Sequence, residues 1–194
     1  MSATDSTVRI LVFAGSARRG SFNKTLARFA AERLGAAGAE ANFVDLADLP
    51  MPLYNQDLED GQFPENAGAF KKMMIEHDGF LIAAPEYNSS ITPLLKNTID
   101  WCSRSATKGE ASAYRGKVAA LVAASPGSMG GLRGLGHVRS ILHSMGVIVI
   151  PQQLAVSQAH QAFDEHGALR DEKTAGRLDG IVEALVDTTR RLKA

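Results

Sequence analysis

Short apolar segments alternate with amphipathic helical patterns along this chain, and the alternation restricts the fold more than any other feature. Each apolar segment has the length and composition of a buried parallel strand. The predicted strands are residues 8–14, 41–46, 79–84, 117–124 and 147–151. The predicted helices are residues 24–37, 65–77, 93–104 and 132–145, and a last one with an apolar face from Leu178 to Leu192. Five strands that alternate with five helices predict an α/β fold, a three-layer α/β/α sandwich around a five-stranded parallel sheet.

Length and composition set further limits. A chain of 194 residues that is 45% hydrophobic has enough core for one domain, which we expect over residues 1–194. Lys plus Arg equals Asp plus Glu, 21 each, and a neutral chain does not favour nucleic acid as a partner. The single cysteine, Cys102, excludes an internal disulfide. The sequence shows no signal-peptide pattern and no apolar run near the roughly 20 residues of a membrane span. We therefore expect a cytoplasmic protein without a membrane partner.

The loop between the first predicted strand and helix, residues 15–23, is rich in hydrogen-bond donors. Backbone N–H groups and the positive end of a helix dipole meet at such a turn and attract anions. Two serine hydroxyls, an asparagine amide and the guanidinium of Arg18 add side-chain donors. The alternative is a plain turn in which Ser21 or Asn23 only caps the helix. The density of donors favours a phosphate site.

The residues of this loop restrict the phosphate compound. The loop is not a Walker A motif, because no Gly-Lys-Ser/Thr follows its glycines, and it lacks the three spaced glycines of the dinucleotide fingerprint. A loop with Ser, Arg and Asn in place of glycines suits a compact, doubly charged phosphate monoester. FMN is the commonest cofactor that ends in one. A flavodoxin-like sheet, with strand order 2-1-3-4-5, binds FMN beside its first strand.

The third and fourth predicted strands also end in unusual loops. Residues 85–90, Pro-Glu-Tyr-Asn-Ser-Ser, predict an irregular backbone that can face a ligand, although Ser90 or Thr92 alone as a helix cap is an alternative. Residues 125–131 hold three glycines, which either allow close approach of a flat ring or form a flexible turn. The carboxyl ends of parallel strands meet at one edge of a sheet, so we expect all three loops to form one site.

Two of these loops carry extended motifs. The first is Gly15-Ser16-x-Arg18-x-x-Ser21-x-Asn23-x-x-Leu26-Ala27. The second is Pro85-Glu86-Tyr87-Asn88-x-Ser90-x-x-Pro93-x-Leu95-Lys96-Asn97-x-x-Asp100-Trp101. Both resemble the signatures of the NAD(P)H-dependent FMN reductase family, which includes bacterial quinone and chromate reductases and flavin-dependent azoreductases. The resemblance extends to residues 49–57 and to Gly130-Gly131-x-Arg133, whereas Leu94 stands where many members have glycine.

The resemblance implies FMN as the cofactor, NADPH or NADH as the co-substrate, and particular contacts to FMN. The implied phosphate contacts are Ser16, Arg18, Ser21, Asn23 and the amide of Phe22. The implied contacts to the ribityl chain and the ring edge, largely through backbone groups, are Pro85, Glu86, Tyr87 and Asn88. Ser125 and Gly127 would lie against the pyrimidine side of the ring. Members are usually dimers or tetramers, which implies a homodimer or homotetramer in which the loop around Tyr54 approaches a neighbouring site.

The function that follows is an NAD(P)H-dependent FMN-containing oxidoreductase, a quinone reductase. Hydride would pass from NAD(P)H through FMN to a quinone, a flavin or a similar small electron acceptor by a ping-pong mechanism. The flavin carries this chemistry, so no catalytic residue is predicted. The alternatives are a flavodoxin-type electron carrier and a non-enzymatic FMN-binding module. Zero net charge argues against a carrier, which is steered to its partner by charge of one sign.

Several residues of reactive type have a structural explanation. We expect Cys102 to be a buried small hydrophobe and Trp101 to pack in the core or an interface. Gly134-Leu135-Gly136 begins like a dinucleotide fingerprint but falls inside a predicted helix. The histidines lack metal-ligand spacing, so no metal site is predicted. Arg104 and Arg115 are the candidates for contact with the 2′-phosphate of NADPH.

Overall fold

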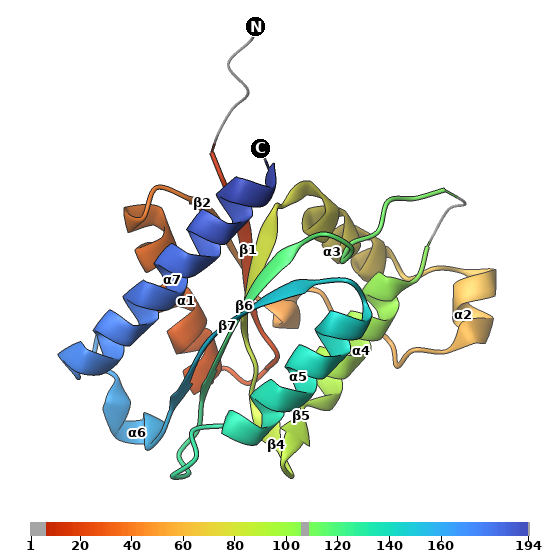
Figure 1. The fold of residues 1–194 in the computed structure, drawn as a ribbon. Helices are drawn as coiled ribbons and strands as arrows, with labels where there is room; N and C mark the ends of the chain where they lie inside the picture. Colours follow the sequence, from red (N-terminus) through yellow and green to blue (C-terminus); the bar gives the residue numbers. More distant parts are fainter. Residues whose placement is uncertain (1–6, 106–108, 194) are drawn as a thin grey trace, which may run out of the picture.

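The computed structural model describes residues 7–105 and 109–193, which form a parallel sheet with helices on both faces (Figure 1). The strand order β2-β1-β3-β6-β7 is 2-1-3-4-5 among the five predicted strands, which confirms the flavodoxin-like α/β/α sandwich. The strands are β1 (Arg9–Ala14), β2 (Glu40–Val44), β3 (Gly79–Ala83), β6 (Val118–Ala124) and β7 (Ile148–Val156). The long helices are α1 (Phe22–Ala36), α3 (Glu65–Glu76), α4 (Pro93–Ser103), α5 (Leu132–Ser144) and α7 (Glu172–Lys193).

The sheet is buried on both faces, which explains why its central strands are continuously apolar. Along β1, Ile10 and Val12 belong to the core under α1 and α7, whereas Leu11 and Phe13 belong to the core under α3, α4 and α5. All four side chains are at most 1% exposed. Alternate residues of a strand point to opposite faces, so a strand covered on both sides needs apolar residues at every position.

Strand β7 is longer than the sequence predicts, and the predicted end at Pro151 was wrong. The strand continues to Val156 because its register with β6 shifts: Val149 pairs with Ala119, and Gln153 pairs with Leu121. Proline cannot donate to a ladder but is tolerated in a bulge on an edge strand. Arg139 donates to the carbonyls of Val149 and Ile150 at 3.2 and 2.8 Å, which satisfies backbone groups that the bulge leaves unpaired.

Three predicted loops contain short regular elements. Residues 47–64 include the end of the 3-10 helix η1 (Leu46–Asp48) and the helix α2 (Gln56–Gly61). Residues 157–167 include α6 (Ala159–Ala162). After β3, strands β4 (Glu86–Tyr87) and β5 (Ser90–Ile91) form a hairpin. Both residues of its turn, Asn88 and Ser89, have positive φ, as a tight hairpin turn requires.

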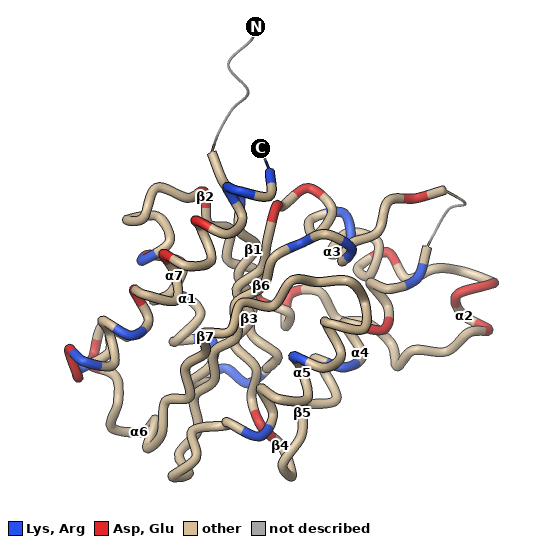
Figure 2. The backbone as a smooth tube through the Cα atoms, in the orientation of Figure 1, with Lys and Arg blue, Asp and Glu red and all other residues tan. Residues whose placement is uncertain are grey.

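Charged residues of both signs are distributed over most elements of the fold (Figure 2). Figure 1 shows the start of β1 and the end of α7 near one edge of the sheet and the hairpin β4–β5 near the other. The edge near the hairpin is where the five parallel strands have their carboxyl ends, and we call it the carboxyl edge. The three predicted site loops therefore lie together there. Among residues 7–105 and 109–193, no helix is both long and apolar enough to cross a membrane.

Candidate functional site at the carboxyl edge of the sheet

The loops after β1 and β3 are bonded to each other. The N–H of Gly15 donates to the carbonyl of Ala83 at 2.9 Å, and the hydroxyl of Thr92 donates to the carbonyl of Gly15 at 2.7 Å. Thr92 is also the predicted N-cap of α4. A Cβ on Gly15 would lie 2.8 Å from Cβ of Leu95, so glycine is needed for α4 to pack this closely. These contacts hold the two loops side by side, as the sequence predicts.

The loop of residues 15–21, here called the phosphate loop after the prediction from the sequence, leads into a capped helix start. Ser21 is the N-cap of α1, and its Oγ accepts a hydrogen bond from the N–H of Lys24 at 3.4 Å. The amides of Phe22 and Asn23 belong to the first turn, where no intrahelical acceptor is available to them. They lie at the positive end of a 15-residue helix, where backbone N–H groups bind phosphate. The predicted cap and an anion site are therefore compatible.

Arg18 is held over the start of α1. Its guanidinium lies 5.5 Å from the ring centroid of Phe22, and the N–H of Arg18 donates to Oγ of the buried Ser16 at 3.3 Å. The Phe22 ring stacks on Phe163, with centroids 6.5 Å apart and an interplanar angle of 6°. The segment after α6 thus supports the phosphate loop, a contact that no local sequence pattern indicates.

The side chain of Asn23 makes two hydrogen bonds within the protein. Its side-chain N–H donates to the carbonyl of Ala124 at 2.7 Å, and its side-chain oxygen accepts from the N–H of Ala124 at 3.0 Å. The residue is 4% exposed. These two bonds join the start of α1 to the end of β6. These two bonds use one N–H of the side-chain amide, so the second side-chain N–H and the backbone N–H of Asn23 are not engaged by Ala124.

The loop after β6 is fixed against the end of β7. The N–H of Ser125 donates to Val156, and the carbonyl of Ser125 accepts from Ala159, at 3.0 and 3.1 Å. Gly130 has a φ of +61°, and a Cβ there would lie 2.7 Å from the carbonyl carbon of Ala155. This glycine is therefore required by the close approach of two backbones, whatever the loop binds.

The loop after β3 presents backbone groups and one exposed ring. Pro85 follows the buried end of β3, and Tyr87 in the hairpin is 54% exposed. The carboxylate of Glu86 turns to the start of α5, where it accepts hydrogen bonds from the N–H groups of Arg133 and Gly134. No local sequence pattern indicates that contact, because 47 and 48 residues separate the partners.

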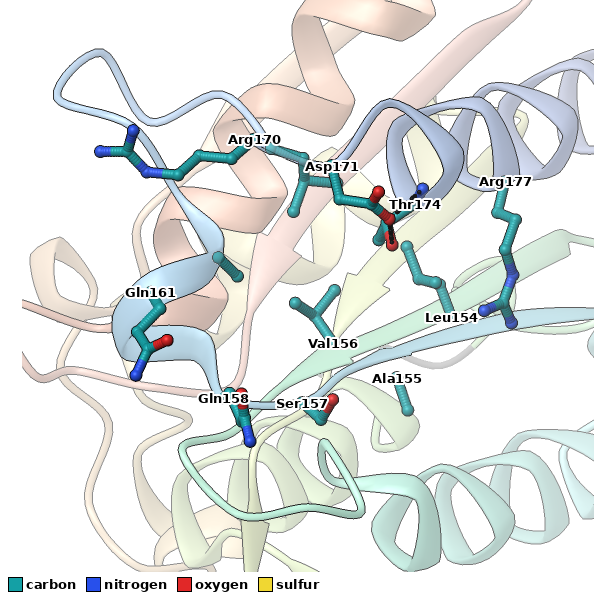
Figure 3. Close-up of a pocket in the computed structure, with 12 residues that line it drawn as sticks. Leu154, Ala155, Val156, Ser157, Gln158, Gln161, Arg170, Asp171, Thr174 and Arg177 are labelled. Carbon is teal, nitrogen blue, oxygen red and sulfur yellow. Dashed lines mark hydrogen bonds between the residues drawn. The ribbon is translucent and has the colours of Figure 1, made fainter.

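A cavity of about 310 Å³ lies outside these three loops, between the end of β7 and the start of α7. Leu154, Val156 and Leu169 contribute apolar side chains to it. Figure 3 shows the side chain of Arg177 directed toward β7, whereas that of Arg170 extends away. None of the predicted site residues lines this cavity, so it is separate from the site at the strand ends.

The two arginines predicted as candidates for contact with the 2′-phosphate of NADPH lie outside the three loops. Arg115 precedes β6, at the opposite edge of the sheet from the three loops, and the seven residues of β6 span on the order of 20 Å. The position of Arg115 therefore does not favour a contact with a ligand at the three loops. Arg104 lies 5.0 Å from the ring centroid of Tyr54 and 3.6 Å from the carboxylate of Glu59.

Trp101 and Cys102 are structural, as predicted. Trp101 is fully buried, its indole N–H donates to the carbonyl of Pro52 at 2.7 Å, and its ring meets Tyr54 and Phe63 edge-on. Cys102 is 1% exposed, and burial raises the pKa of its thiol to about 12. The thiolate is the reactive form, so this cysteine is chemically protected.

We expect the Cys102 thiol to resist an aromatic disulfide reagent at pH 8 in the native protein. With a pKa of about 12, roughly one molecule in 10⁴ carries the thiolate at that pH. Absorbance of the released thiolate dye measures the reaction. The same protein in guanidinium chloride, where the thiol is exposed, serves as the control and should react with one equivalent. Rapid stoichiometric labelling of the native protein would contradict the prediction.

The chain is similar to known proteins in both sequence and structure. The family model described as NADPH-dependent FMN reductase matches residues 8–161. An NAD(P)H:quinone oxidoreductase of Solanum tuberosum is 37% identical over 197 residues, which cover 98% of this chain and 97% of the relative. A 2-hydroxy-1,4-benzoquinone reductase of Burkholderia sp is 36% identical, with 91% and 93% covered.

Among solved structures, a flavoenzyme NAD(P)H:(acceptor) oxidoreductase from Paracoccus denitrificans, FerB, superimposes with a TM-score of 0.82 and 30% sequence identity. The match covers 95% of this chain and 98% of that protein. The family model spans β1 to α6, and so includes all three loops at the carboxyl edge.

Proposed function

Because the chain belongs to the NADPH-dependent FMN reductase family, we propose that its three carboxyl-edge loops bind FMN and that electrons pass to a quinone in ping-pong order. The chain is an NAD(P)H-dependent, FMN-containing oxidoreductase, and not the electron carrier that the sequence left as an alternative. The observation that carries the site assignment is the convergence of three loops from β1, β3 and β6 on one edge. Two of these loops are joined through Gly15 and Ala83.

The phosphate loop fits the phosphate of FMN. The amides of Phe22 and Asn23 offer two backbone donors at the positive end of α1. Arg18 adds a charge-assisted donor, and the hydroxyls of Ser16 and Ser21 lie in the same loop. Oxygens of a phosphate monoester accept several hydrogen bonds at once. Asn23 contributes its backbone N–H and the side-chain N–H that its two bonds to Ala124 leave unused.

The loops after β3 and β6 fit a flat ring and a flat acceptor. Backbone groups of residues 85–88 and of Ser125 and Gly127 line the ribityl chain and the ring in this proposal. Tyr87, Met129 and Leu132, in or directly after the same loops, are 54%, 44% and 41% exposed. Exposed apolar side chains that form a patch mark ligand or partner sites, whereas single ones do not. They suit a planar, largely apolar acceptor such as a quinone.

The division of work between protein and cofactor is simple. Bound FMN supplies the hydride chemistry, and the protein supplies position and hydrogen bonds. The three loops bind the cofactor at one edge, and the nicotinamide and the quinone use the same exposed face in turn. NAD(P)H would give up a hydride and leave as NAD(P)⁺ before the quinone enters, and the quinone would take the two electrons and the proton of that hydride together with one proton from water. Ping-pong kinetics follow from this shared position.

Absorbance near 450 nm tests the function directly. FMN-loaded protein is mixed anaerobically with NADPH or NADH in a stopped-flow instrument, and a quinone is added afterwards. We expect rapid bleaching by the nicotinamide and recovery of absorbance on addition of the quinone. A FMN-loaded protein that neither NADPH nor NADH bleaches would contradict the enzymatic proposal, and a protein that does not bind FMN would contradict the site itself. Initial rates at varied concentrations of both substrates should give parallel reciprocal plots.

The proposal also includes the oligomeric state and the cellular location of the protein. Leu53, 78% exposed, and Leu58, 39% exposed, lie in the loop around Tyr54. This apolar surface supports a homodimer or homotetramer in which that loop meets a second copy. A single unpaired, buried Cys102 suits the reducing cytoplasm.

A further inference from the structure

The side chain of Glu86 connects the loop after β3 with the start of α5, which directly follows the loop after β6. Glu86 lies in β4, and its Oε2 accepts hydrogen bonds from the backbone N–H groups of Arg133 and Gly134, at 2.9 and 3.1 Å. Its Oε1 lies 3.7 Å from a guanidinium nitrogen of Arg133. The side chain is 13% exposed. One carboxylate, largely withdrawn from water, thus spans two segments that are distant in the sequence.

Helix α5 depends on this carboxylate for its capping. Its N-cap is Gly131, with a φ of +91°, and glycine has no side chain that can accept a hydrogen bond from the first turn. The first-turn amides of a helix need acceptors, and a negative charge beside them is favourable to the helix dipole. Glu86 supplies both from another part of the chain. It performs the work that a Ser, Thr or Asp N-cap performs locally in other helices.

The packing around this contact is close. A Cβ on Gly134 would lie 3.3 Å from the carbonyl oxygen of Ser90 and 3.4 Å from Cβ of Glu86. Helix α5 therefore rests directly against the hairpin β4–β5, with glycine at the point of contact. A hydrogen-bonded carboxylate at this position fixes the distance between the hairpin and the helix start.

We propose that the side chain of Glu86 positions the flavin site by acting through its carboxylate on α5, whereas only the backbone of Glu86 lines the cofactor. The proposal rests on the proposed function, which places the loops after β3 and β6 on either side of the flavin ring. A binding site made of two loops loses affinity when their spacing fluctuates, because binding must then order them. The backbone of residues 85–88 faces the ring, while the carboxylate of Glu86 holds that backbone in register with Ser125 and Gly127.

The test compares two helix caps in the same protein. Asp171 caps α7 in a similar way: its Oδ2 accepts from the N–H of Thr174 at 2.9 Å, and it belongs to none of the three loops. The Kd for FMN is measured by quenching of flavin fluorescence, and Tm by circular dichroism. We expect Glu86→Ala to raise the Kd for FMN at least tenfold and Asp171→Ala to change it less than twofold. Both substitutions remove a helix cap and lower Tm.

Two further variants separate capping from charge pairing. Glu86→Gln keeps an oxygen that can accept both N–H bonds, so it should bring the Kd back to within threefold of the wild-type value. Arg133→Ala removes the guanidinium but keeps the backbone N–H, so it should change the Kd less than twofold.

Specific outcomes would overturn the proposal. Equal FMN affinity of the Glu86→Ala and Asp171→Ala proteins would show that the cap has no effect on the flavin site. A Glu86→Gln protein that binds FMN as weakly as Glu86→Ala would assign the effect to charge and not to the cap. A wild-type protein that does not bind FMN would instead contradict the proposed function, which keeps the two failures distinct.

Discussion

Asn23→Leu is expected to lower the free energy of unfolding of the protein by about 2–4 kcal/mol. The side chain of Asn23 bonds both the N–H and the C=O of Ala124 from 101 residues away, and it is 4% exposed. Past the last residues at which β3 pairs with β6, the side-chain amide of Asn23 bonds the backbone of β6 as a neighbouring strand would. Leucine has a similar size but leaves both backbone groups of Ala124 without a partner. A buried unsatisfied group costs about 1–3 kcal/mol, and the apolar side chain offsets part of the total.

Urea titration of the cofactor-free protein, followed by circular dichroism, measures this effect. Asn66→Leu is a matched control, since Asn66 is the second residue of α3 as Asn23 is of α1. The Asn66 amide donates to the carbonyl of Pro50 in an exposed position, and its loss should cost below about 1 kcal/mol. Equal losses in the two variants would show that the two bonds to Ala124 carry no special weight.

The sheet was predictable because its strands are buried on both faces. Continuous apolar runs such as residues 118–124 can only be covered strands, and right-handed crossovers with helices between them leave few arrangements. The short elements were not predictable in the same way. A helix of four residues such as α6 has no periodicity to detect, and β7 passes Pro151 only because a bulge and Arg139 satisfy the backbone around it.

The location of the candidate site could be predicted from the sequence, but only some of the contacts within it could. The composition of the donor-rich loop after β1 and of the glycine-rich loop after β6 indicates a binding site. The side-chain partners of Asn23 and Glu86 cannot be predicted in this way, because they lie 101 and 47 residues away and are brought close only by the complete fold. Gly130 shows the same difference: its sequence context suggests room for a ring, whereas its position against Ala155 explains it by backbone packing.

Arg18 also illustrates how the fold prepares a site. The guanidinium rests over Phe22, and Phe22 stacks on Phe163, so two aromatic rings restrict the arginine before any ligand is present. Less conformational entropy is then lost when the guanidinium bonds an anion. The contribution of Phe163 appears only in the structure.

Arg18→Ala is expected to weaken FMN binding by about 1.5–3 kcal/mol, the range for a hydrogen bond to a charged group. This corresponds to a rise of about 10- to 150-fold in the Kd for FMN. Titration of the cofactor-free protein with FMN and, separately, with riboflavin isolates the phosphate, because riboflavin has a hydroxyl in its place. The riboflavin Kd should stay within about twofold of the wild-type value. Arg19→Ala removes a neighbouring exposed arginine and is the charge-matched control. Equal weakening of FMN and riboflavin would assign Arg18 to the shape of the loop, and unchanged FMN affinity would place the phosphate elsewhere.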